Sequence, residues 1–120
     1  MARKSRFELK LLELESLAGD SSFCARKLAK ACGLSLRQLQ RQFHRILNQT
    51  PKKWLTRQRI LLSCERLSGD EAIKEVAIDL GFKQASHFSR EFKRIIGSTP
   101  SQFVEKHRFG GHDMNNVAFR

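Results

Sequence analysis

A chain of 120 residues, 40% of them hydrophobic, is long enough for one compact domain or for two small subdomains with a shared connector. Its formal net charge of +11 predicts a polyanionic partner, and the candidates are DNA, RNA and an acidic membrane surface. The sequence has no run of 18 apolar residues and no signal-peptide pattern, so we expect a cytoplasmic protein without a membrane partner.

Apolar residues at helical spacing predict an all-α chain of about seven helices, and no alternating strand pattern occurs. The predicted helices span approximately residues 4–17, 25–32, 35–47, 51–67, 73–80, 85–96 and 100–106. Gly33, Gly81 and Gly97 stand where helices end, because a left-handed residue closes a helix at least cost when it lacks a Cβ. Residues 107–120 have no periodicity, and we expect a flexible tail there.

Residues that cap helices mark several of the predicted helix starts. Ser35 and Gln38 match a capping box, in which each side chain bonds the backbone N–H of the other residue. Thr50-Pro51 and Thr99-Pro100 each supply a capping threonine followed by a proline whose missing N–H is harmless. Cys24 is a poor cap, so the start of the second helix is less sharply defined.

The chain nearly repeats residues 28–54 as residues 76–103. Gly33 recurs as Gly81 at an offset of 48, and after one extra residue in the turn Phe43 recurs as Phe92 at an offset of 49. A duplicated unit of this size predicts two similar subdomains. We therefore expect one domain over residues 5–106, with helix-turn-helix units at about 25–47 and 73–96 and a long connecting helix at 51–67.

Acidic residues are absent from a long part of the first half. Between Asp20 and Glu65 there is no Asp or Glu, although this interval contains ten Lys and Arg residues. A solvated surface normally mixes both signs, so the interval indicates a face that meets a polyanion.

A short helix, a tight glycine-containing turn and a second helix with a polar outer face form the helix-turn-helix plan, whose second helix enters the DNA major groove. Arginine and glutamine suit that groove, because they bond the edges of guanine and adenine. The candidate contacts of the first recognition helix are Arg37, Gln38, Gln40, Arg41, His44 and Arg45. The internal offset of 49 transfers four of these positions to Ser86, Ser89, Arg90 and Arg94, and we add His87 as a polar or phosphate-contacting residue.

The stretch GFKQASHFSREFKRIIGSTPSQF, from Gly81 to Phe103, resembles the signature of the AraC/XylS family of bacterial transcription regulators. The resemblance covers about residues 7–106. It implies a seven-helix domain that reads double-stranded DNA through two recognition helices in successive major-groove segments on one face. The family's contacts would fall on Arg37, Gln40, Arg41, Ala85, Ser86 and Arg90. It further implies a nucleoid-associated regulator of transcription, an activator or a repressor, with RNA polymerase as a second candidate partner.

Three residues depart from the family pattern in the second unit. Ala85 replaces a frequent glutamine, Gln84 replaces a common capping residue, and Val104 replaces the usual arginine. We therefore expect the first unit to carry most of the sequence specificity. An effector would bind only through an additional domain, for which 120 residues leave no room, so the chain is either a small stand-alone regulator or the C-terminal part of a longer one.

Other interpretations were weighed against this one. The three cysteines form no CxxC pair, so we interpret them as free thiols, two or three of them in the core, and expect no metal or cofactor. DNA-repair methyltransferases carry a similar module, but the four-cysteine zinc site is missing, so we expect no enzyme. An RNA-binding or protein-binding helical module would not need two matched arginine-bearing helices. Trp54 and Phe103 fit core packing better than base stacking.

Overall fold

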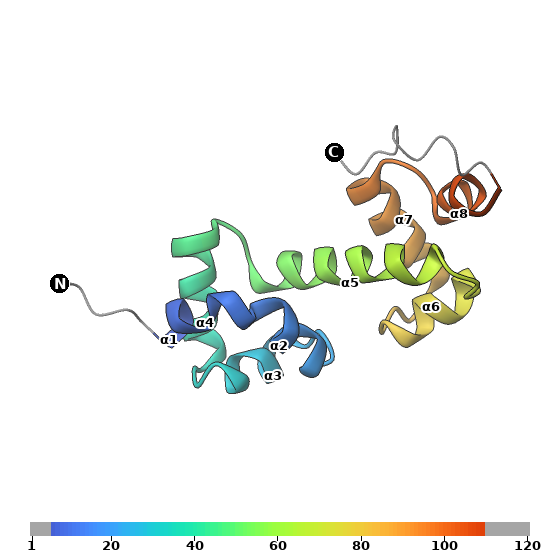
Figure 1. The fold of residues 1–120 in the computed structure, drawn as a ribbon. Coiled ribbons are helices and arrows are strands. Elements are labelled where there is room, and N and C mark those ends of the chain that lie inside the picture. Colours follow the sequence, from blue (N-terminus) through green and yellow to red (C-terminus); the bar gives the residue numbers. More distant parts are fainter. Residues whose placement is uncertain (1–5, 110–120) are drawn as a thin grey trace. The chain divides into compact units, whose positions relative to one another are not determined.

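The computed structural model describes residues 6–109, and over this range every regular element is helical (Figure 1). In chain order the elements are α1 (Arg6–Lys10), η1 (Leu11–Glu13), α2 (Leu14–Asp20), α3 (Ala25–Ala31), α4 (Leu36–Gln42), η2 (Phe43–Leu47), α5 (Pro51–Leu67), α6 (Ile73–Asp79), α7 (Ala85–Ile96) and α8 (Pro100–Phe109). Because η1 is a 3-10 turn that joins α1 to α2 and η2 is a π-helical turn that continues α4, the described residues form seven helical segments. The predicted all-α fold class is confirmed.

The helices divide into two compact units, residues 1–58 and 59–120. The first unit contains the α3–α4 pair and the second contains the α6–α7 pair. Helix α5 begins in the first unit and ends in the second.

The core of the first unit is built around a run of aromatic rings. Phe7 from α1 and Phe43 from η2 are fully buried, with ring centroids 5.1 Å apart. Trp54 from α5 packs edge-on against Phe43 at 5.6 Å and is 8% exposed. Leu28 and Leu39 are buried in the same cluster, so α3 and the recognition helix share one core. The edge-to-face geometry suits the positive ring edges and negative ring faces of aromatic side chains.

The second unit repeats this arrangement with a longer aromatic run. Phe82, Phe88, Phe92 and Phe103 are all buried, and successive ring centroids lie 5.2, 5.6 and 5.5 Å apart. His107 then stacks on Phe103 at 4.0 Å. Trp54 and Phe103 therefore occupy core positions, as the sequence predicts.

The predicted helix caps are present. Ser35 and Gln38 form the full capping box, with distances of 2.9 Å from Ser35 N to Gln38 Oε1 and 3.1 Å from Gln38 N to Ser35 Oγ. Thr50 Oγ1 accepts a hydrogen bond from the N–H of Lys53 at 3.1 Å. Thr99 forms a second reciprocal box with Gln102, which the sequence analysis did not identify.

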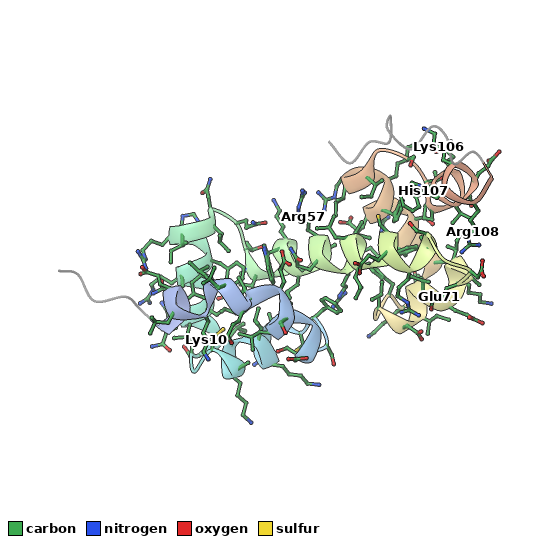
Figure 2. All side chains as sticks on the ribbon, in the orientation of Figure 1. Lys10, Arg57, Glu71, Lys106, His107 and Arg108 are labelled. Atoms are coloured by element: carbon green, nitrogen blue, oxygen red, sulfur yellow. The ribbon has the colours of Figure 1, made fainter. Side chains whose placement is uncertain are left out.

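The structure moves two predicted boundaries. The first helical segment continues beyond Leu17 to Asp20, and the last helix continues beyond Lys106 to Phe109. Residues 107–109 are therefore helical, contrary to the predicted flexible tail, and residues 110–120 lie outside the described part of the chain. The extension has a physical cause, since Arg108 donates a hydrogen bond to the backbone carbonyl of Glu71 at 2.6 Å (Figure 2).

Glu71 also binds Arg66, and together they fix the loop between α5 and α6. The guanidinium of Arg66 donates from Nε to Glu71 Oε2 at 2.9 Å and from Nη2 to Asp79 Oδ2 at 2.8 Å. The bond to Glu71 joins the residues before α6 to the end of α5 and lowers the pKa of the Glu71 carboxyl, whereas the bond to Asp79 joins the end of α6 to the end of α5. The loop that leads into the second helix-turn-helix pair is thus tied at both ends.

Candidate nucleic-acid interface

The turns that present the two recognition helices are built in the same way. Gly33 and Gly81 have φ values of 72° and 90°, in the left-handed region that favours glycine. The N–H of Leu34 bonds the carbonyl of Ala29 at 2.9 Å, and the N–H of Phe82 bonds the carbonyl of Ala77 at 3.0 Å. With the bonds from Gly33 N to Lys30 O and from Gly81 N to Ile78 O, both at 3.0 Å, each turn is a Schellman motif. The repeat therefore preserves the turn bond by bond.

The first recognition helix consists of α4 and η2. Its buried side is formed by Leu39 and Phe43, and all the predicted contact residues on its other side are exposed. These exposed residues are Arg37, Gln38, Gln40, Arg41, His44 and Arg45. The helix ends at Asn48, which is left-handed with φ of 53°. An outward polar face on a helix anchored by a buried stripe is the form that groove insertion requires.

The arginines of this helix differ in their partners. Arg45 donates through Nη2 to Oε1 of Glu8 at 3.0 Å and to Oε1 of Gln42 at 2.7 Å. Arg37 and Arg41 make no ion pair or side-chain hydrogen bond with other residues in the range 6–109. Arg37 and Arg41 are therefore available to an external ligand, whereas Arg45 must first leave Glu8.

The second recognition helix, α7, buries Phe88, Phe92 and Ile96. Five of the predicted contact residues are exposed and Ser89 is partly buried. The exposed five are Ala85, Ser86, His87, Arg90 and Arg94. The N-cap residue Gln84 makes no side-chain capping bond, so this helix starts without the box that Ser35 gives its counterpart.

Charge on the outer face of α7 is partly cancelled. Arg94 donates to Oε1 of Glu91 from Nη2 at 2.7 Å and from Nε at 3.1 Å. These bonds lower the pKa of the Glu91 carboxyl, helped by the charges of His87 and Arg90 and opposed by desolvation. His87 also meets Phe82 edge-on at a centroid distance of 5.3 Å. Arg90 makes no ion pair within the described residues.

Most of the net positive charge of the chain lies in its first unit. Residues 1–58 contain 13 Lys and Arg against 4 Asp and Glu, whereas residues 59–120 contain 10 against 8. A polyanion will therefore be attracted more strongly by the first unit than by the second.

Several residues that contact the two predicted recognition helices or the turn before α7 were not identified from the sequence. Glu8, Gln42 and Glu91 hold the two paired arginines, and Arg59 lies over the ring of Phe82 with Cζ at 5.5 Å from the centroid. Glu91 lies three residues before Arg94, and this spacing is a signal that helix geometry alone supplies. Glu8 gives no such signal, because it lies 37 residues from Arg45.

The described residues also bear on metal binding, membrane crossing and the state of the cysteines. Within residues 6–109 no group of three His, Cys, Asp or Glu side chains is arranged to hold a metal ion. None of the helices in that range combines the length and the apolar character needed to cross a membrane. The cysteines are free: Cys32 and Cys64 are buried and Cys24 is half-buried. Burial raises the pKa of the Cys64 thiol to about 11, whereas the backbone N–H of Lys27 lowers the pKa of Cys24.

Comparison with known proteins places this geometry in a family. The model of a helix-turn-helix domain family matches residues 28–106. Regulatory protein SoxS of Salmonella typhimurium is 37% identical over 82 residues, which cover 68% of this chain and 75% of SoxS. The virulence regulon transcriptional activator VirF of Yersinia enterocolitica is 31% identical over 77 residues, which cover 63% of this chain and only 28% of VirF.

Two solved structures have the same fold. A transcriptional regulator of the AraC-type DNA-binding domain class from Chromobacterium violaceum superposes with a TM-score of 0.75 at 25% identity, covering 88% of this chain and 97% of that one. The DNA-binding domain of the global transcriptional factor AdpA, solved in complex with a target DNA, gives a TM-score of 0.66 at 28% identity and covers 84% and 96% of the two chains.

Proposed function

Because this chain belongs to the AraC/XylS family of helix-turn-helix transcription regulators, we propose that it binds double-stranded DNA sequence-specifically as a bacterial transcription regulator. One observation carries the proposal. Two helices related by an internal repeat expose polar faces with arginines that form no ion pair within residues 6–109, namely Arg37, Arg41 and Arg90. A structural role alone would not require the same outward arginine at equivalent positions of both units.

In the proposed mechanism the two recognition helices enter successive segments of the major groove on one face of the duplex. Arg37 and Arg41 bond guanine edges, and Gln40 is suited to adenine. On α7, Ala85 contacts a thymine methyl, while Ser86, Ser89 and Arg90 contact bases or phosphates. His44 and His87 contact phosphates at the edges of these sites. The protein acts in the cytoplasm on the nucleoid, without a catalytic step.

We further propose that the first unit supplies most of the specificity. It has the larger excess of basic residues, the capping box at Ser35 and two arginines that have no partner among the described residues 6–109. The second unit has Ser86 where the first has Arg37, and its Arg94 is already paired. It therefore contributes register and phosphate contacts more than base reading. RNA polymerase is the proposed second partner, and an effector would require a domain outside this chain.

Selection of bound sequences from a random duplex pool tests the proposal. We expect a selected sequence that binds much more tightly than a scrambled duplex, with two recognised segments of unequal information. Neutralising about six phosphates makes log K fall with log salt at a slope of roughly −5. A pool that yields no preferred sequence, or a single-stranded RNA competitor that displaces the duplex at equal concentration, would contradict sequence-specific duplex binding.

A further inference from the structure

Both recognition helices carry, at equivalent positions, an arginine that is neutralised by a carboxylate. Nη2 of Arg45 lies 3.0 Å from Oε1 of Glu8, and Nη2 of Arg94 lies 2.7 Å from Oε1 of Glu91. The two arginines are 49 residues apart in the sequence, the offset that relates the two helices. Since Glu8 lies on α1 and Glu91 on α7, the repeated feature is the paired arginine rather than a copied acid.

The residue three positions before each arginine also matches. Gln42 accepts a hydrogen bond from Arg45 at 2.7 Å, and Glu91 at the equivalent position accepts one from Arg94 at 2.7 Å. Both guanidinium groups are therefore folded back along their own helix. In the first unit the acceptor Gln42 is uncharged, and Glu8 of α1 supplies the carboxylate. In the second unit Glu91 is both the hydrogen-bond acceptor and the carboxylate.

These arginines share a helix face with the residues that read DNA in the proposed function. Positions four apart on a helix are neighbours, so Arg37, Arg41 and Arg45 form one row and Arg90 and Arg94 belong to its counterpart. A free arginine at either end of these rows would lie beside the phosphates that flank the groove. Such a contact would add attraction that is the same for every sequence.

The carboxylates are able to prevent this contact without making the helices rigid. The side chains of Arg45 and Arg94 are 56% and 55% exposed, so each pair is a surface ion pair, which is weak in water. A phosphate that displaced a carboxylate would still face that negative charge at short range. The hydrogen bonds from Arg94 also keep the pKa of Glu91 below its ordinary value, so Glu91 remains ionised at neutral pH.

We propose that Glu8 and Glu91 limit the sequence-independent affinity of this chain for DNA, because they keep Arg45 and Arg94 from adding attraction to DNA phosphates. This inference rests on the proposed function as a DNA-binding regulator. A regulator meets a large excess of other DNA, on which sequence-independent attraction to phosphates retains it. Each carboxylate therefore weakens binding to the competing sequences without changing the base preference.

The test compares alanine variants that release an arginine with variants that only remove a charge. Glu8→Ala and Glu91→Ala each free one arginine. Glu15→Ala and Glu105→Ala remove the same charge from exposed acids that form no ion pair within residues 6–109. Affinity is measured over a range of salt concentrations for the selected duplex and for a scrambled duplex, and thermal unfolding confirms that each variant is folded.

For Glu8→Ala and Glu91→Ala we expect a salt slope on the scrambled duplex that is steeper by about 0.9 and an affinity about two- to eightfold higher at 0.1 M salt. The affinity for the selected duplex rises by the same factor, because the added attraction does not depend on the sequence. The control variants leave the slope unchanged and alter both affinities by the same small factor.

Equal effects of the test and control variants would overturn the inference, because they would show that only net charge matters. Unchanged slopes in Glu8→Ala and Glu91→Ala would do the same, and either result leaves the proposed function intact if the wild-type chain prefers the selected duplex. A wild-type chain that binds no duplex removes the proposed function and this inference together.

Discussion

The capping box at the start of the first recognition helix gives the sharpest stability prediction. Ser35→Ala deletes the hydroxyl that accepts the N–H of Gln38 at 3.1 Å and removes the reason for Gln38 to fold back onto the N–H of Ser35. Both bonds are exposed, so water replaces them in part. Loss of such a cap costs about 1 kcal/mol, within a range of about 0.5–2 kcal/mol.

The opposite change is available in the second unit. The side chain of Gln84 makes no capping bond. A serine at this position can accept a hydrogen bond from the N–H of His87, the third residue of α7. Because His87 cannot complete the reciprocal half of the box, Gln84→Ser should stabilise by less than Ser35→Ala destabilises, about 0.5 kcal/mol. Ser16→Ala serves as a control, since Ser16 is exposed within α2 and caps nothing.

The chain has one tryptophan, and Trp54 packs against Phe43 in the core of the first unit. Urea unfolding followed by tryptophan fluorescence therefore reports on that unit, while far-ultraviolet circular dichroism reports on all helices. Ser35→Ala should lower the urea concentration at which the fluorescence transition is half complete. The melting temperature of this variant should fall by about 4–8 °C for a unit of this size. If Ser35→Ala and Ser16→Ala unfold at the same urea midpoint by fluorescence, the capping argument is wrong.

Three further changes test other parts of the account. Cys24 should react with a thiol reagent at pH 8 well before Cys64, whose pKa of about 11 leaves little thiolate. Gly81→Ala forces a left-handed φ on a residue with a Cβ and should cost about 1–2 kcal/mol in urea unfolding, because the φ of Gly81 is 90°. Arg66 lowers the pKa of Glu71 in the folded state. The Arg66–Glu71 pair therefore stabilises the fold at pH values above the unfolded-state pKa of Glu71, and this stabilisation disappears as the pH falls through the folded-state pKa. The difference in midpoint between wild type and Glu71→Gln should therefore shrink on acidification below about pH 4.

The parts of the fold that follow from local chemistry were predictable from the sequence. The repeat revealed the two helix-turn-helix units, and the left-handed positions at Gly33, Gly81 and Gly97 followed from the cost of a Cβ there. The capping box at Ser35 was equally local, since its partner lies three residues away. Each of these features is determined by neighbours in the sequence, so periodicity and residue type are sufficient.

The missed features depend on residues far apart in the chain. The last helix extends to Phe109 because Arg108 reaches a carbonyl 37 residues earlier, and the pairing of Arg45 with Glu8 spans the same distance. The π-helical turn over Phe43–Leu47 has no counterpart in α7, although the sequences of the two recognition helices align without a gap. The residue pattern therefore did not predict this turn. Nothing in the sequence distinguished Arg41, without a partner, from Arg45, which has one.

The central claim is that the first recognition helix carries most of the sequence specificity. Its most direct test is a titration of wild type, Arg37→Ala, Arg41→Ala and Arg90→Ala against the selected duplex and every single-base variant of it. We expect Arg41→Ala to cost about 1–3 kcal/mol on the selected duplex and to abolish the preference at one base pair, with Arg37→Ala behaving similarly at another. Arg90→Ala should weaken binding to all the duplexes by a similar factor. If Arg90→Ala relaxes base preference more than either first-helix variant, the specificity lies in the second unit and the claim is wrong.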